Sequence, residues 1–352
     1  MLDRPLFWRR SQPGGAGVRL LLSPIAWLYA GVTALRNRWF DWGWRETRAP
    51  LVPTISVGNL SVGGTGKTPI TAWLASRLVQ QGERVGIVLR GFGDDELKVL
   101  AQLVPAAIIV ADPDRVAGSA AALQSGATAI VLDDAFQHRR AGRDIDVVLL
   151  SADAEDEVLA VLPAGPLREP LSGLRRAGLI LITRKAAPEA AVTRVEAMAA
   201  AVAPSVPTAV VALSGDALHR WSDGLSAPLD LLRDRVVVAV SGIGEPTPFE
   251  QQLTAAGARV TGFRFADHHA YTAEDVRDLL VRVPADALVV CTLKDAVKLG
   301  LLWPDPAPPL WYLSQRITVE RGGAAIDAAL AALPQRFLAR ARVTVDLPPT
   351  NR

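Results

Sequence analysis

At 352 residues, the chain is longer than the roughly 250 to 300 residues that one hydrophobic core usually supports, which predicts two domains. Half of the residues are hydrophobic and 21% are charged, which excludes a disordered or fibrous protein. The single cysteine, Cys291, excludes an internal disulfide and a cysteine-based metal site, and is typical of a reducing, cytoplasmic compartment.

The net charge of +2 hides a basic N-terminal unit, residues 1–48. This unit has eight Arg against three acidic residues, a local charge of +5, and five of the nine Trp. Nothing after it indicates a basic face, so we expect no nucleic-acid partner.

The apolar part of this unit predicts a helix at a membrane surface. Sixteen uncharged residues lie between Arg19 and Arg36, fewer than the about 20 that a helix needs to cross the hydrocarbon core. Arg on both flanks and a cluster of Trp are typical of a segment in the headgroup region. The alternative is a helix packed on the body of the protein.

Residues 49–187 are predicted to form a doubly wound α/β domain. Short apolar runs alternate there with helix-like stretches, and runs that are apolar on both faces are typical of a parallel sheet covered on both sides. The expected strands are Thr54–Val57, Val85–Leu89, Ala107–Val110, Ala129–Leu132, Asp146–Leu150 and Leu179–Thr183.

A second, smaller α/β domain is predicted over residues 188–320. Ala-rich, Pro-punctuated sequence over 186–207 is typical of a helix followed by a change of domain. Residues 321–352 are expected to form a C-terminal helix and tail that can return to the first domain. The strands expected in the second domain are Val236–Val240, Arg259–Phe263 and Ala287–Cys291.

The strongest local signal is a glycine-rich segment, Gly58 to Pro69, that follows the first expected strand and opens a helix. Glycines let backbone N–H groups surround a polyphosphate, a lysine reaches the β- and γ-phosphates, and a threonine hydroxyl can bind Mg²⁺. A plain glycine-rich turn, the alternative, does not explain a Gly-Lys-Thr order in a chain with only five Lys. The sequence therefore predicts a phosphate loop whose binding residues are Gly63, Gly64, Thr65, Gly66, Lys67 and Thr68.

A hydrophobic strand that ends in Asp133 and Asp134 is the second signal of a phosphate site. Such a strand places a carboxylate at the carboxyl edge of the sheet, beside the phosphate loop, where it can hold Mg²⁺. Two adjacent side chains point in different directions, so we expect only one of them to meet the metal. A capped surface turn is the alternative.

A phosphate loop leaves the reaction open. A guanine-specific switch needs an Asn-Lys-x-Asp or Thr-Lys-x-Asp element, and neither Thr183–Ala186 nor Thr292–Asp295 matches it. A kinase needs a base on the acceptor side. The candidates are Asp94, Asp95, Glu96, His138, His268 and His269, although a helix cap led by Asp267 would also explain the last two.

Together these motifs resemble the tetraacyldisaccharide 4'-kinase family, the lipid A 4'-kinases of Gram-negative envelopes. The resemblance runs from about Arg4 to Ala332. Its motifs, in chain order, are Val57–Pro69, Arg90–Gly93, Asp133–His138, Leu162–Glu169, Ser241–Gly244, Asp267–His268 and Lys294–Lys298.

The chain departs from the family pattern after Gly93. Family members have a longer stretch before a Gly-Asp-Glu-Pro element, whereas here Gly93 leads directly into Asp94, Asp95 and Glu96. Asp95 and Glu96 align best with the family's catalytic Asp-Glu pair, because the residues that follow continue the helix in register; a shift by one to Asp94 is the alternative. Three further departures are Phe92 for Tyr, Ala135 for Gly and Leu293 for Glu.

The resemblance implies a lipid kinase that uses ATP and Mg²⁺ to phosphorylate the 4'-hydroxyl of a tetraacylated glucosamine disaccharide 1-phosphate at the cytoplasmic face of the inner membrane. It implies catalytic roles for Asp95, His268 and Lys67, and a nucleotide-binding role for Arg115 beside the phosphate loop. The candidate metal ligands are Thr68, Asp133, Asp134 and Glu169, and the candidate substrate-binding residues are Arg90, Gln137, His138 and Arg168.

No obligatory protein partner is implied. The alternative from another class is a partition- or switch-type ATPase that acts on a protein partner at the membrane. Such an ATPase would consume ATP without any dependence on a lipid disaccharide.

Overall fold

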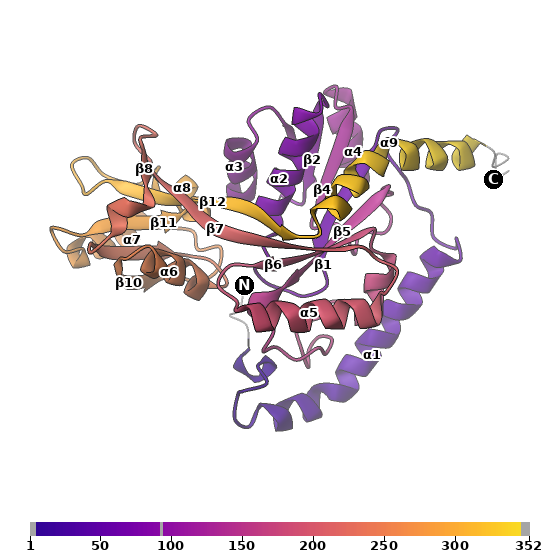
Figure 1. Cartoon of the computed structure of the whole chain (residues 1–352), viewed down its shortest axis with the longest axis horizontal. Coiled ribbons are helices and arrows are strands. Elements are labelled where there is room, and N and C mark those ends of the chain that lie inside the picture. Colours follow the sequence, from indigo (N-terminus) through magenta and orange to yellow (C-terminus); the bar gives the residue numbers. More distant parts are fainter. Residues whose placement is uncertain (1–4, 92–93, 346–352) are drawn as a thin grey trace.

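The computed structural model describes residues 5–91 and 94–345. Its described strands form one sheet in the order β10-β9-β11-β12-β7-β6-β5-β1-β4-β2-β3, with the short β8 beside β7. Neighbouring strands along this order are parallel, except that β7 pairs antiparallel with β12. A single mixed sheet therefore passes through the whole molecule (Figure 1).

The first half is the expected doubly wound α/β unit, and its strands are mostly buried on both faces, apart from the partly exposed edge strand β3. Each strand predicted there is present, and its observed ends differ from the prediction by at most two residues. The elements are β1 (Thr54–Asn59), α2 (Lys67–Gln80), β2 (Val85–Leu89), α3 (Asp94–Leu103), β3 (Ile108–Ala111), α4 (Arg115–Gln124), β4 (Ala129–Asp133), β5 (Ile145–Ser151), β6 (Leu179–Arg184) and α5 (Glu189–Val202).

The second half contains the three predicted strands and three that sequence analysis missed: β7, β8 and β12. The long strands β7 and β12 cross from one half to the other (Figure 1). The elements are β7 (Thr208–Arg220), β8 (Ser226–Pro228), β9 (Val236–Ser241), α6 (Pro246–Ala255), β10 (Arg259–Arg264), α7 (Ala273–Arg282), β11 (Leu288–Thr292), α8 (Leu293–Leu299), β12 (Leu310–Arg321) and α9 (Gly323–Val345). Short 3₁₀ helices lie at Leu6–Trp8, Ala152–Ala154, Leu171–Arg176 and Leu229–Leu232.

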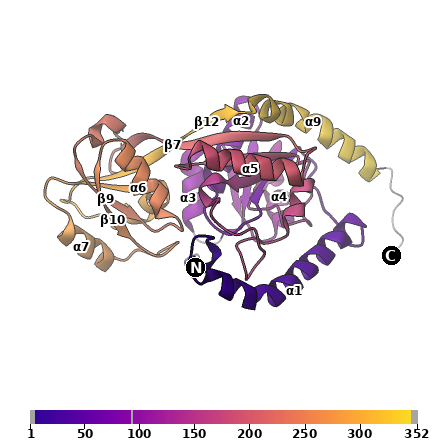
Figure 2. The same cartoon turned by 60° about the horizontal axis from the view of Figure 1, so that its bottom comes forward.

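Helices α5 and α9 cover opposite faces of the first half of the sheet (Figures 1 and 2). Residues alternate between faces along a strand. Ile180 of β6 packs in the cluster that contains Val192 of α5, whereas its neighbour Leu181 packs in the cluster that contains Leu330 of α9. Helix α5 therefore packs with the first half, although the predicted boundary at residue 188 assigned it to the second domain. The boundary itself remains a prediction.

A close approach of two chain segments supports the strand that leads into the phosphate loop. A Cβ atom at Gly58 would lie 2.7 Å from the Cβ of Phe136 and 2.8 Å from its backbone nitrogen. Because real Cβ atoms do not approach this closely, β1 must shift to accommodate a larger residue. We expect Gly58→Ala to lower the free energy of unfolding by about 1–3 kcal/mol, measured by urea denaturation.

Gly31 provides the control for this prediction, because a Cβ added there meets no atom within 4 Å. It lies inside a helix, so Gly31→Ala should be neutral or stabilising by up to about 1 kcal/mol. Equal stabilities of Gly58→Ala and the unaltered protein would contradict the argument.

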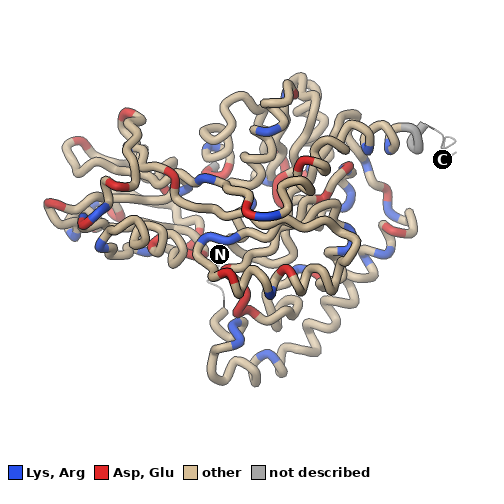
Figure 3. Tube along the Cα trace, in the orientation of Figure 1, with Lys and Arg blue, Asp and Glu red and all other residues tan. Residues whose placement is uncertain are grey.

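The N-terminal helix α1 (Gly15–Asp41) lies along the outside of the first half (Figure 2). It is the one helix among the described residues that is long and apolar enough to cross a membrane, judged by length and composition alone. Only 6% of its most apolar 18-residue window is buried, and its middle is nearly free of charge (Figure 3). The helix is longer than the apolar run because it continues through Arg36 to Asp41.

Candidate active site

The phosphate loop joins β1 to α2, and Lys67 is the first residue of that helix. Gly63 and Gly66 adopt φ angles of 109° and 86°, a backbone region that favours glycine. The Asn59 amide donates to the Thr65 hydroxyl at 3.0 Å and accepts from Lys67 Nζ at 3.4 Å. Backbone N–H groups at a helix N-terminus attract anions, so the local structure agrees with the predicted phosphate loop.

The two adjacent carboxylates at the end of β4, Asp133 and Asp134, point in different directions, as expected. Asp133 is buried and accepts a hydrogen bond from Thr71 Oγ1 at 2.5 Å, and burial raises its pKa to about 6. Asp134 faces the loop, with one oxygen 3.9 Å from Lys67 Nζ and 2.9 Å from Arg168 Nη1. Although burial raises the pKa of Asp134, the charges of these two cations lower it below its usual value. Of the two carboxylates, Asp134 is therefore the one that faces the phosphate loop.

Arg115 is buried beneath these carboxylates at the start of α4. Its guanidinium donates to the carbonyl oxygen of Asp133 at 3.0 Å and to that of Asp112 at 2.9 Å. Burial lowers the pKa of Arg115, and the charges of Asp133 and Asp134 oppose that shift. Arg115 thus holds the end of β4 in place through the Asp133 carbonyl and adds positive charge beside Asp133 and Asp134.

The charges of Arg115 and Arg90 both act on His138. Burial lowers the pKa of His138, the charge of Arg115 lowers it further, and Arg90 acts in the same direction. Arg90 is exposed at the end of β2. The next two residues of its motif, Phe92 and Gly93, lie outside the described residues.

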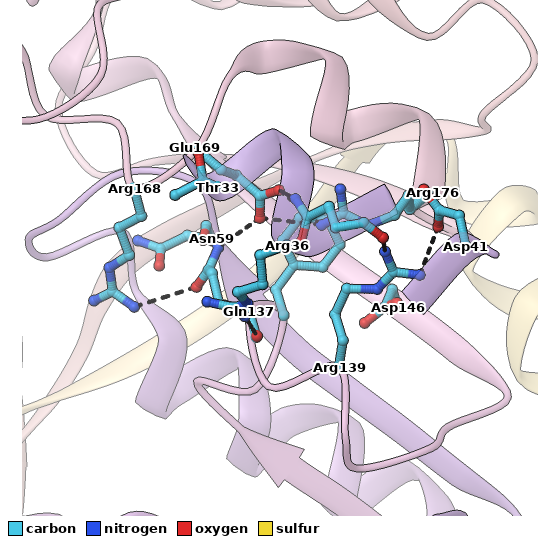
Figure 4. Close-up of polar contacts among 12 residues, drawn as sticks. Thr33, Arg36, Asp41, Asn59, Gln137, Arg139, Asp146, Arg168, Glu169 and Arg176 are labelled. Atoms are coloured by element: carbon cyan, nitrogen blue, oxygen red, sulfur yellow. Dashed lines mark hydrogen bonds and ion pairs between the residues drawn. The ribbon is translucent and has the colours of Figure 1, made fainter. Parts of the chain in front are cut away.

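A buried carboxylate, Glu169, organises the other candidate substrate residues (Figure 4). It accepts hydrogen bonds from Arg176 at 2.9 Å, from Gln137 Nε2 at 3.0 Å and from Asn37 Nδ2 at 2.8 Å. Gln137 Nε2 also donates to the carbonyl oxygen of Asn59 at 3.0 Å. These contacts favour a structural role for Glu169, and its role as a metal ligand remains a prediction.

The inner face of α1 contacts this cluster, which sequence analysis did not anticipate. The Tyr29 hydroxyl donates to the carbonyl oxygen of Arg168 at 2.9 Å, and Arg36 donates to that of Gln137. The residues on this face are Tyr29, Thr33, Arg36 and Asn37, at the three- and four-residue spacing of one helix face. That polar spacing within an apolar helix was the signal that could have identified them.

Asp95, at the start of α3 in the first half, contacts His268, which follows β10 in the second half. Asp95 Oδ2 lies 3.1 Å from His268 Nδ1 and 3.8 Å from Lys298 Nζ. Although burial raises the pKa of Asp95, the hydrogen bond to His268 and the charges of His268 and Lys298 lower it to about 2. The same hydrogen bond raises the pKa of His268. The pair is thus an ionised carboxylate and a basic imidazole, a combination that can accept a proton.

A buried carboxylate holds the loop that carries His268. Asp295 accepts hydrogen bonds from the backbone of Gly242 at 3.0 Å, from the Tyr271 hydroxyl at 2.8 Å and from the Thr292 hydroxyl at 2.6 Å. Gly242 in turn accepts the backbone N–H of His268 at 3.1 Å. The motifs that contain Gly242, His268 and Asp295 lie far apart in the sequence but are hydrogen-bonded to one another. These contacts support the unusual φ of 58° at His268.

A phosphate loop, a carboxylate that faces it and an Asp-His pair that joins the two halves together define a P-loop phosphotransferase. The model of the LpxK family, tetraacyldisaccharide-1-P 4'-kinase, matches residues 18–334. The chain belongs to this family, which confirms the family and the kinase class inferred from its motifs.

Relatives and a solved structure agree with this assignment. The tetraacyldisaccharide 4'-kinase of Anaeromyxobacter dehalogenans (strain 2CP-C) is 37% identical, with 92% of this chain and 93% of that protein covered. The enzyme of the same name from Stenotrophomonas maltophilia (strain R551-3) is 34% identical, with 90% and 92% covered. A crystal structure of "apo" form LpxK from Aquifex aeolicus in complex with ATP matches with a TM-score of 0.69 and 27% identity, covering 90% of this chain and 99% of that one. The predicted fold class is confirmed.

Proposed function

We propose that this chain transfers the γ-phosphoryl group of ATP to the 4'-hydroxyl of an acylated glucosamine disaccharide 1-phosphate. The observation that carries the proposal is the contact of 3.1 Å between Asp95 and His268 at the edge of the sheet where the phosphate loop also lies. ATP in the crystal structure of the Aquifex aeolicus relative supports the choice of nucleotide. The names of the relatives support the choice of acceptor.

The phosphate loop and its neighbours would bind the nucleotide. Backbone N–H groups over residues 63–68 would surround the phosphates, with Lys67 at the β- and γ-phosphates and Arg115 below. Arg168 would remain beside Asp134, where a planar guanidinium can also contact an anionic headgroup. Arg90, Gln137 and His138 complete the proposed substrate side.

The residues present fit a magnesium ion that is shared with the nucleotide. Among the described residues, no group of three His, Cys, Asp or Glu side chains could hold a metal alone. Mg²⁺ in phosphotransferases usually takes one or two carboxylates, phosphate oxygens and waters, so Thr68 and Asp134 suffice as protein ligands. When bound, the ion neutralises charge on the β- and γ-phosphates. Asp133, held by Thr71, would support the turn beneath it.

The Asp-His pair would take the proton of the attacking hydroxyl. Asp95 stays ionised because its pKa is about 2, and it fixes Nδ1 of the imidazole. The other ring nitrogen, Nε2, can then accept the 4'-hydroxyl proton as the oxygen attacks the γ-phosphorus and the bond to ADP breaks. Because the two residues come from different halves, the base is complete only where the halves meet.

Helix α1 would hold the enzyme at the cytoplasmic face of the inner membrane, where an acylated substrate lies. Its outer face is apolar and exposed, whereas its inner face contacts the Glu169 cluster. Trp and Arg on its flanks suit the headgroup region. No protein partner is needed for this association.

The membrane-binding face has a direct test. We expect the combined change of Leu21, Trp27 and Leu28 to Ser to weaken binding to anionic phospholipid vesicles by at least about tenfold, because each exposed side chain would lose its burial in the bilayer. Vesicle co-sedimentation measures the effect, and raised salt should weaken what remains. Leu301→Ser, at a similarly exposed site in the second half, is the control. Undiminished binding by the triple variant would reject the anchor.

The activity itself is tested with the full chain, labelled ATP and the disaccharide 1-phosphate lipid. A doubly phosphorylated lipid is the expected product, and ATP consumption should depend on the lipid. Consumption of ATP at the same rate without lipid, and with no lipid product, would reject the proposed function.

A further inference from the structure

The few lysines of this chain gather around the proposed nucleotide site. The chain has five Lys against 33 Arg. Lys67 lies in the phosphate loop, and Lys185 contacts that loop. Lys294 and Lys298 contact the acidic residues Glu96 and Asp95 at the start of α3. A compact ammonium, unlike a guanidinium, can approach a single phosphate oxygen as a point charge. Lys67, Lys185 and Lys298 each make two or more contacts, whereas the contact of Lys294 is an ion pair with Glu96.

Lys294 lies in the first turn of α8, directly after the carboxyl end of β11. Its ammonium is 3.5 Å from Glu96 Oε1 of α3, and both side chains are partly exposed. A charge-assisted hydrogen bond is typically about 2.7–2.9 Å long. The pair is therefore loose, and a stronger anion can separate Lys294 from Glu96.

The charge of Lys294 affects both Lys67 of the phosphate loop and His268 of the proposed base. Burial lowers the pKa of Lys67, and the charge of Lys294 lowers it further. Lys294 also opposes the rise in the pKa of His268 that the hydrogen bond to Asp95 causes. The geometry agrees: the ammonium contacts Glu96, the residue next to Asp95 of the proposed base, at the junction of the two halves.

The first half alone supplies limited free positive charge for the γ-phosphate. Asp134 contacts both Lys67 and Arg168, so part of their charge is already compensated. Glu96 adds a further negative charge, which helps to raise the pKa of the buried Asp133. Phosphoryl transfer needs cations aimed at the oxygens of the moving group.

We propose that Lys294 is a phosphate-binding residue contributed by the second half, and that it leaves Glu96 to bind the γ-phosphate of ATP. This inference rests on the proposed use of ATP and deepens it: the second half would recognise a nucleoside triphosphate and not the diphosphate product. Loss of the contact after transfer would favour release of ADP.

The test compares the affinities of the full chain for MgATP and MgADP by isothermal titration calorimetry. Lys294→Met keeps the aliphatic stem and removes the charge. We expect its affinity for MgATP to fall about tenfold or more, and its affinity for MgADP to stay within about twofold of the unaltered protein. Lys98→Met, which removes the exposed lysine of α3, should change neither affinity.

Glu96→Gln separates phosphate binding from the ion pair. It removes the partner of Lys294 but keeps the ammonium, so the preference for MgATP over MgADP should be retained or increased. Loss of that preference in Glu96→Gln would overturn the proposal, because the bridge to α3 would then be the important contact. Equal losses of MgATP and MgADP affinity in Lys294→Met would also overturn it.

An unchanged MgATP affinity in Lys294→Met, together with a raised KM for the lipid, would assign the ammonium to the lipid phosphate and overturn the γ-phosphate contact. These outcomes are distinct from failure of the proposed function, in which the unaltered protein would bind MgATP without forming any phosphorylated lipid.

Discussion

Lys67→Ala is expected to lower turnover by roughly 10³-fold while the protein remains folded. The ammonium of Lys67, on a partly buried side chain, lies between Asn59 Oδ1, at 3.4 Å, and Asp134, at 3.9 Å. Its removal leaves negative charge on the transferring phosphoryl group without compensation at the moment when that charge moves toward ADP. Initial rates with saturating lipid, and with ATP varied, measure the loss.

The fold should survive this change because Asp134 keeps its contact with Arg168 at 2.9 Å. No buried carboxylate is therefore left unpaired. Lys98→Ala removes an exposed lysine and should leave turnover unchanged. Turnover near that of the unaltered protein in a folded Lys67→Ala variant would refute the phosphate-loop assignment.

Replacement of Asp95 by Asn is expected to lower turnover by about 10²- to 10⁴-fold with little change in ATP affinity. An amide cannot stabilise a protonated imidazole, and it presents a donor as readily as an acceptor to His268 Nδ1. His268→Ala removes the proposed proton acceptor and should lower turnover by a smaller factor than Asp95→Asn. Because the two residues act as one unit, the double variant should fall far short of the product of the single losses.

The pH profile distinguishes this role from a purely structural one. The hydrogen bond to Asp95 raises the pKa of His268, so activity should rise with pH through that raised pKa as the ring loses its proton. In Asp95→Asn the inflection should move down toward the ordinary histidine pKa of about 6.5.

Asp94→Asn is the control for the alignment across the shortened loop, and its effect on turnover should be mild. If Asp94→Asn is the severe change and Asp95→Asn is tolerated, the assignment across the shortened loop is wrong by one residue.

Local sequence pattern predicted the first half of the fold well because most of its strands are buried on both faces. Short apolar runs rich in β-branched residues, such as Val85–Leu89, are typical of such strands, and the Gly-Lys-Thr sequence marks the loop that follows β1. Strands β7 and β12 escaped prediction because their apolar runs are interrupted. Ser214, Gly215 and Asp216 lie in the middle of β7, where it pairs with polar residues of β12. Their pairing with each other, and with β6 and β11, makes them part of the sheet.

The arrangement of the candidate site was predictable around the phosphate loop and much less so across the two halves. Motifs next to strands indicate Lys67 and the pair Asp133 and Asp134, and the structure shows that Asp134 is the one that faces the loop. Asp95 and His268 are separated by 173 residues, and the family resemblance, not any spacing, suggested them. The role of Asp295 could not be foreseen, because a buried carboxylate with three donors is defined only by the folded chain.

The contact between α1 and the Glu169 cluster has a geometric consequence for an enzyme at a membrane. Asn37 donates to Glu169, Glu169 also accepts from Gln137, and Gln137 donates to the carbonyl oxygen of Asn59 at the end of β1. Three short hydrogen bonds thus connect the proposed anchor to the strand that ends in the phosphate loop. With α1 immersed in the headgroup layer, the height of the phosphate loop above the bilayer would be set by this connection. The enzyme would then act at one fixed depth, on hydroxyl groups that a lipid presents at that level.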